Sequence, residues 1–178
     1  IGMRLDGKFA LVVGVANERS IAWGIAKSLV DAGAQVGIVY QNERLARRVR
    51  PLAESIGAIL CHPCDMTNDA ELDALFDMVA TKLPQIHCLV HSIAFARRED
   101  LLGPFLDTSR KGFKLAQDVS AYSLIELVRR ARPHLVAGSS VLALSYLGAE
   151  RVVPSYKVMG PAKAALEASV RYLAAELG

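Results

Sequence analysis

Two phenols and one amine in the last part of the chain could do chemistry together. Tyr146 comes shortly after the apolar run at residues 141–144, and Tyr156 and Lys163 follow it. If one helix carries Tyr156 and Lys163, their seven-residue spacing is about two turns, roughly 10.5 Å of rise, and places both on one face. A cation beside a phenol favours phenolate and makes the phenol a better hydrogen-bond donor. Such a group is suited to stabilising a negative charge that develops on a substrate oxygen.

Two alternatives stay open for this group. Tyr and Lys at this spacing also occur by chance on solvent-exposed helix faces. In addition, Gly160 and Pro161 lie between Tyr156 and Lys163. Proline favours the first turn of a helix, so the helix either begins near Gly160, with Tyr156 on the preceding turn, or begins earlier and is bent at Pro161.

The elements that must position these residues alternate between strands and helices. Apolar runs predict buried parallel strands at residues 8–14, 35–40, 58–64, 86–93 and 139–145. Helical periodicity and capping residues predict helices at residues 20–33, 43–56, 69–83 and 112–132, and a last helix that runs towards residue 178. This alternation indicates an α/β fold, a doubly wound parallel sheet of the Rossmann type, in a single domain at residues 1–178.

Composition excludes several classes of function. The net charge of +3 is too small to indicate a nucleic-acid partner, and no apolar run is long enough for a membrane span. The three cysteines do not form a disulfide framework, which favours a reducing cytoplasm. Cys61 and Cys64 form a C-x-x-C motif, but no second ligand pair is spaced for a metal, and the motif ends a strand instead of opening a helix. We therefore expect no metal.

The turn from Gly14 to Ser20 is a candidate phosphate-binding turn. Gly14 allows a tight turn after the first strand, and the N-terminus of the next helix offers free N–H groups to a pyrophosphate. Ser20 is expected to cap that helix and to add its hydroxyl. Small residues at Ala22 and Gly24 are expected to let the helix lie close to the sheet. The spacing is not G-x-G-x-x-G, and any turn between a strand and a helix can use glycine and serine.

The end of the second strand predicts which dinucleotide binds. An acidic residue there hydrogen-bonds the ribose hydroxyls of NADH, whereas an arginine accommodates the 2′-phosphate of NADPH. This chain has Gln41, which can bond a hydroxyl, and Arg44 three residues later. We expect NADH, with NADPH as the less favoured alternative. Asp65 either accepts from the adenine amino group or caps the helix that starts near Asn68. His91 lies within an apolar strand and is expected to be a core residue.

Four motifs together resemble one family. They are G-x5-S-I-A-x-G at residues 14–24, H-S-I-A at 91–94, L-S-Y-L-G-A-E-R at 144–151 and Y-x6-K at 156–163. The chain resembles the divergent short-chain dehydrogenase/reductases, and within them the NADH-dependent enoyl-[acyl-carrier-protein] reductases of bacterial fatty-acid synthesis. Conventional short-chain dehydrogenases have Y-x3-K, whereas here Gly160 is the fourth residue after Tyr156.

The resemblance implies an activity and its residues. NADH would reduce the double bond of a trans-2-enoyl thioester, Tyr156 would bond the thioester oxygen, with Tyr146 nearby, and Lys163 would hold the nicotinamide ribose. Along the cofactor the resemblance places Gly14, Ala16, Ser20, Ile21, Gln41, Asp65, Met66, Ser92, Ile93, Ala94 and Lys163. Against the acyl chain it places Ala96, Tyr146 and Met159.

The resemblance also implies partners and an assembly. The substrate would be linked to acyl carrier protein, and the enzyme would be a cytoplasmic homotetramer. Members of the family continue through further C-terminal strands, so we expect this chain to be truncated, with its fifth strand or that strand's neighbour at an exposed sheet edge. A short-chain carbonyl reductase and a non-catalytic NAD-binding domain are the alternative functions.

Overall fold

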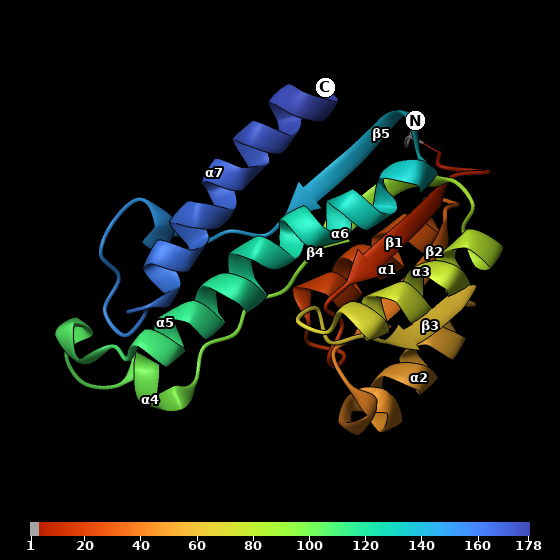
Figure 1. Cartoon of the computed structure of the whole chain (residues 1–178). Coiled ribbons are helices and arrows are strands. Elements are labelled where there is room, and N and C mark those ends of the chain that lie inside the picture. The colour runs from red at the N-terminus through yellow and green to blue at the C-terminus, as the bar shows by residue number, and fades with distance from the viewer. Residues whose placement is uncertain (1–3) are drawn as a thin grey trace. The chain divides into compact units, whose positions relative to one another are not determined.

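A computed structural model describes residues 4–178 (Figure 1). The strands are β1 (Phe9–Val13), β2 (Gln35–Tyr40), β3 (Leu60–Pro63), β4 (Ile86–His91) and β5 (Leu135–Ala143). They form one sheet in the order β3-β2-β1-β4-β5. The pairs β1–β2, β1–β4 and β2–β3 are parallel. The predicted doubly wound parallel sheet is confirmed.

Contacts divide the chain into two compact units, and each is described by itself. The first consists of Ile1–Ser92 and Arg130–Leu142, and the second of Ile93–Arg129 and Ala143–Gly178. The assignment of a single domain stays a prediction. Among the described residues, no helix is both long enough and apolar enough to cross a membrane.

The core of the first unit forms around the central strands. β1 and β2 are almost wholly buried, because helices must cover both faces of a parallel sheet. The helices of this unit are α1 (Ile21–Asp31), α2 (Ala46–Ser55), which follows a short 3₁₀ turn (Glu43–Leu45), and α3 (Asp69–Lys82). Ala22, Trp23 and Ala26 form the buried face of α1.

Gly24 does not have the packing role that the sequence suggested. It is exposed, and a β-carbon there would meet no atom within 4 Å. Ala22, in contrast, is fully buried. The close approach of α1 to its neighbours therefore depends on Ala22, and the prediction for Gly24 was wrong.

The fifth strand is longer and more exposed than predicted. It begins at Leu135, directly after a 3₁₀ turn (Arg132–His134) that contains Pro133. It stands last in the order of the described strands, and Val141 and Leu142 are exposed although both are apolar. Among the described strands β5 is thus one of the two edge strands, with β3 at the other edge, and the expected edge position of the fifth strand is confirmed.

The second unit is helical. It contains α4 (Arg98–Leu101), α5 (Arg110–Gln117), most of α6 (Ser123–Ala131) and α7 (Met159–Leu177). Figure 1 shows α5 and α7 side by side. The predicted continuous helix at residues 112–132 was wrong, because a π-helical turn (Asp118–Tyr122) separates α5 from α6. Within this turn Ser120 Oγ accepts from Phe95 N at 3.0 Å and donates to Phe95 O at 3.2 Å.

Candidate active site

The cofactor candidates of the first unit lie at one edge of the sheet. Val13 is the register partner of both Val39 and His91, so β1, β2 and β4 end at nearly the same level. In a parallel sheet the residues after the strands then collect beyond that edge. The predicted residues at this edge are Gly14, Ala16, Ser20, Ile21, Gln41, Asp65, Met66 and Ser92.

Gly14 forms a close contact that only glycine allows. Its φ is +114°, and a β-carbon there would overlap the carbonyl oxygen of Ser92. Its N–H donates to Val39 O at 2.9 Å. The ends of β1 and β4 therefore come together without a side chain between them, which leaves a cradle of bare backbone at the start of the turn.

Ser20 is the N-cap residue of α1, but its side chain bonds the preceding turn instead of the helix. It occupies the position before α1, but its side chain makes no capping hydrogen bond. Its Oγ instead accepts from the backbone N–H groups of Ala16 and Asn17, both at 3.0 Å. A serine hydroxyl that accepts twice still has its proton to donate. The predicted cap position is therefore confirmed, whereas a capping bond from the side chain was a wrong prediction. The first N–H groups of α1 and the hydroxyl proton can both serve an anion.

Polar residues also follow β2 and β3: those after β2 are exposed, and the one after β3 is held by hydrogen bonds. Gln41 and Arg44 are both exposed after β2. After β3, Asp65 Oδ1 accepts from the backbone N–H and the hydroxyl of Thr67, at 2.9 and 2.8 Å. Asn68 caps α3, so the alternative role of Asp65 as the cap was wrong. His91, at the end of β4, is fully buried, as a core residue should be.

In the second unit, Lys163 is buried on the second turn of α7. It is 5% exposed, and its Nζ donates to Leu144 O at 2.6 Å. Burial lowers the pKa of this amine, because the charged form loses its hydration. An ammonium has three N–H donors, so two remain for a ligand after the bond to Leu144.

Tyr156 does not share a helix with Lys163. α7 begins at Met159, as the alternative reading of Gly160 and Pro161 predicted, and Tyr156 lies in the turn before it. The residues on either side, Ser155 and Lys157, have φ values of +66° and +45°. The spacing of two helical turns was therefore a wrong prediction.

The pKa of Tyr156 is shifted in the direction opposite to the one expected beside a cation. Its pKa is raised, by burial first and by the neighbouring Tyr146 second, whereas an adjacent cation would lower it. The two rings lie 4.7 Å apart between centroids at an angle of 60°. Tyr146 is half exposed. Tyr156 is thus a neutral phenol, which can donate a hydrogen bond.

The acyl-chain candidates pack around the same phenol. Met159 belongs to a buried cluster with Ala116, Val158 and Ala162, and Ala96 and Tyr156 pack against that cluster. Ser120 Oγ lies 3.7 Å from Met159 Sδ. Ala96, Met159 and Tyr156 therefore belong to one cluster, and Tyr146 contacts the Tyr156 ring. Ile93 and Ala94, the other cofactor candidates, open the unit directly after Ser92 in sequence.

Two residues that sequence reasoning did not single out support this group. A β-carbon at Gly148 would overlap the Tyr156 ring, so glycine gives the phenol its space. Ser145 Oγ donates to Glu167 Oε1 on α7. Gly148 lies in the L-S-Y-L-G-A-E-R motif at residues 144–151. A glycine shortly after a strand that leads into a site is a signal of close packing. Glu167 gave no comparable signal.

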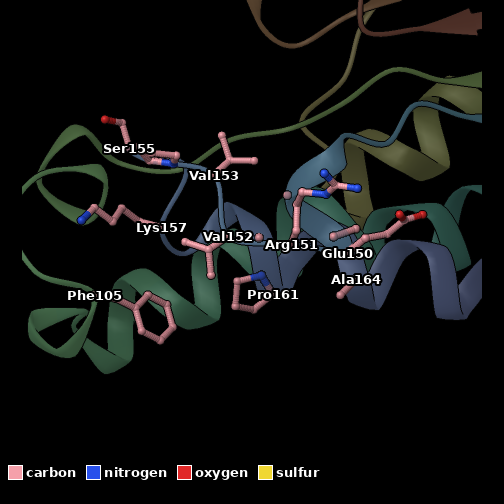
Figure 2. Close-up of a pocket in the computed structure, with 13 residues that line it drawn as sticks. Phe105, Glu150, Arg151, Val152, Val153, Ser155, Lys157, Pro161 and Ala164 are labelled. Carbon is pink, nitrogen blue, oxygen red and sulfur yellow. The ribbon is translucent and has the colours of Figure 1, made fainter.

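A pocket of about 560 Å³ lies in the second unit (Figure 2). Phe105, Val152 and Pro161 contribute apolar walls, and Lys157 and Arg151 are its cationic lining residues. Tyr146, Tyr156 and Lys163 are not among the lining residues. The pocket therefore borders the group of phenols and amine, through Gly148 and the two neighbours of Tyr156 in sequence, but does not include the three side chains.

Comparison with known proteins gives consistent matches. Residues 14–178 match the family described as Enoyl-(Acyl carrier protein) reductase. The chain is 54% identical to the NADH-dependent enoyl-[acyl-carrier-protein] reductase of Bacillus cereus over 176 residues, and 49% identical to that of Bacillus subtilis over 176 residues. These matches cover 98% of this chain and 69% and 68% of the two relatives.

Solved structures agree with the sequence matches. The crystal structure of the Aquifex aeolicus enoyl-[acyl-carrier-protein] reductase (NADH) has a TM-score of 0.95 and 47% identity, with 99% of this chain and 70% of that chain covered. The Bacillus cereus enoyl-acyl carrier protein reductase, crystallised with NADP+ and indole naphthyridinone, has a TM-score of 0.94 and 54% identity over 99% of this chain and 70% of that chain.

Proposed function

Because the chain belongs to the enoyl-(acyl carrier protein) reductase family, we propose that it reduces the double bond of trans-2-enoyl thioesters carried by acyl carrier protein, using NADH, in fatty-acid synthesis. The observation that carries this proposal is 54% identity to an NADH-dependent enoyl-[acyl-carrier-protein] reductase over nearly the whole chain. The neutral phenol of Tyr156 and the buried amine of Lys163, which belong to the same unit, support it.

The sheet edge of the first unit fits a dinucleotide. The bare backbone at Gly14 and Ser92 lets a ligand approach closely. The N-terminus of α1, together with the Ser20 hydroxyl, offers donors to a pyrophosphate. Gln41 can bond a ribose hydroxyl without charge repulsion, which agrees with NADH as the cofactor. Asp65, Met66, Ile21, Ile93 and Ala94 are proposed to line the rest of its path.

Tyr156 and Lys163 are the residues that stabilise the negative charge developing on the thioester oxygen. When bound, NADH supplies the hydride that reaches the β-carbon of the substrate. Negative charge then develops on the thioester oxygen, and Tyr156 donates a hydrogen bond to it, since its raised pKa keeps its proton in place. Lys163 uses the donors that Leu144 leaves available to hold ribose hydroxyls and adds positive charge. Tyr146, Ala96 and Met159 orient the phenol and contact the acyl chain.

The test is NADH consumption with a crotonyl thioester by the native protein, monitored by loss of NADH absorbance. Tyr156→Phe should lower kcat, because the hydrogen bond to the developing oxyanion disappears; losing one such donor costs about 10²–10³-fold. A ketone substrate tested in parallel should not be reduced. Full activity of Tyr156→Phe, or turnover of the ketone alone, would refute the assignment.

The assembly and location are proposals of the same kind. We propose a homotetramer built through the helices of the second unit. The aromatic side chains of Phe113, Tyr122 and Tyr172 are exposed on these helices, and Tyr172 has 81% of its surface exposed. Exposed apolar surface of this kind marks an interface with another protein. Light scattering that shows a stable monomer would exclude it. We also propose a cytoplasmic location, in agreement with the three free cysteines. Fractionation of the native cells tests this second proposal.

A further inference from the structure

Two consecutive residues before Tyr146 are bonded to two successive turns of α7. Leu144 O accepts from Lys163 Nζ at 2.6 Å, and Ser145 Oγ donates to Glu167 Oε1 at 2.5 Å. Lys163 and Glu167 are four residues apart on α7, so they lie one above the other on the same helix face. Residues 144 and 145 are therefore attached to α7 at two points.

The second of these bonds is strong for its position. A hydroxyl that donates to a carboxylate makes a charge-assisted bond, which is shorter and roughly twice as strong as a neutral one. Ser145 is exposed and Glu167 is partly exposed, so the bond lies at the surface and its charge assistance is what favours it there. The bond joins residues that are 22 positions apart in sequence, and it therefore fixes tertiary geometry and not local helix structure.

The attachment leads directly to the reacting phenol. Tyr146 is the next residue after Ser145, and its ring packs on Tyr156. The following turn contains Gly148, whose backbone lies against the same phenol. A shift of Ser145 would thus move two of the surfaces that hold Tyr156 in place.

We propose that Glu167 is a positioning residue of the reductase site. Through Ser145 it holds the segment 145–148 in register with α7, and so keeps the Tyr146 ring and the Gly148 backbone in place against Tyr156. The inference rests on the proposed function. Glu167 touches neither the substrate nor the cofactor in this assignment, and it acts only through the Ser145 hydroxyl.

The test compares four variants and one control in the native protein. Glu167→Ala and Ser145→Ala should each lower kcat for the crotonyl thioester by about 10- to 100-fold, the effect of misplacing a reacting group by up to about 1 Å. The double variant should lose no more than either single variant, because both remove the same bond. Glu167→Gln should stay within about twofold of the native kcat, since its amide oxygen still accepts from Ser145. Glu176→Ala, an exposed glutamate on the same helix, is the matched control.

Two readouts are independent of turnover. Amide hydrogen exchange at residues 145–149 should accelerate in Glu167→Ala and Ser145→Ala and stay native in Glu167→Gln and Glu176→Ala. The Kd for NADH, read from the fluorescence of the cofactor, should stay within about twofold of the native value in all variants, because Lys163 keeps its bond to Leu144.

The outcomes separate this inference from the proposed function. If the native protein does not reduce the thioester, the proposed function fails, while hydrogen exchange still tests the attachment. If the native protein turns over and Glu167→Ala has native kcat and native exchange, the positioning role is wrong. It is equally wrong if Glu167→Gln is as impaired as Glu167→Ala, or if the losses of the two single variants add in the double variant.

Discussion

An alanine at position 148 should disable the site by crowding Tyr156. A β-carbon there would lie 2.7 Å from Tyr156 Cε1 and closer still to Cδ1, whereas ordinary contact begins at 3.4 Å. The ring must therefore move by at least 0.7 Å at Cε1 (3.4 − 2.7). The φ of Gly148 lies outside the left-handed region, so the backbone itself accepts alanine. The conflict is with the phenol.

The size of the effect follows from this displacement. Misplacing a reacting group by about 1 Å costs about 10²-fold in rate, so we expect Gly148→Ala to lower kcat by between about 10- and 100-fold. This corresponds to about 1.4–2.7 kcal/mol in the barrier. If the ring holds its position instead, the overlap appears as lost stability of about 1–3 kcal/mol. NADH consumption with the crotonyl thioester measures the first effect, and urea unfolding measures the second.

The matched control uses the Tyr156→Phe background. The hydroxyl that Gly148→Ala misplaces is already absent there, so the double variant should have the same kcat as Tyr156→Phe alone. The reasoning is refuted if Gly148→Ala keeps a kcat within about twofold of the native enzyme and also keeps its unfolding midpoint. A native kcat with reduced stability would show that the backbone around residue 148 moves before the phenol does.

Three further predictions concern other parts of the chain. Gly14→Ala should weaken NADH binding, measured by cofactor fluorescence, because its β-carbon would overlap the Ser92 carbonyl; an unchanged Kd would contradict the proposed cradle. Asp100→Ala should lower the free energy of unfolding by about 2 kcal/mol, measured in urea, because the buried carboxylate accepts from Arg97 Nε at 3.1 Å; an unchanged midpoint would contradict this. Burial lowers the pKa of Lys163, so the contribution of Lys163 to stability should rise as pH increases from that lowered pKa towards its ordinary value of 10.5. The difference in Tm between the native protein and Lys163→Met over this pH range measures that contribution, and a constant difference would contradict it.

The order of strands and helices could be predicted from local pattern because the parallel sheet needs continuous apolar runs. The run at residues 35–40 coincides with β2. The helix at residues 112–132 could not be predicted correctly, because its interruption depends on Ser120 bonding the backbone of Phe95, 25 residues away. Periodicity within a helix contains no information about a partner at that distance.

The candidate site was predictable in its chemistry and less so in its geometry. The Gly160-Pro161 pair did indicate that the helix begins after Tyr156, and the structure follows that alternative. The raised pKa of Tyr156 depends on burial, which the spacing of residues does not reveal. A glutamate four residues after a lysine is typical of an exposed helix face, so nothing local distinguishes Glu167 from such a residue.

The π-helical turn at Asp118–Tyr122 gives this segment room to lose one residue. A π turn contains one residue more than an α turn over the same rotation of the helix. Deleting a single residue there would therefore restore regular α-helical winding and leave the residues that follow on their present helix face. Buried Leu124 and Leu127 would stay in the interior, whereas a single deletion within α6 itself would rotate everything that follows by about 100°. A deletion library should therefore find single-codon deletions tolerated more often at residues 118–122 than within α6.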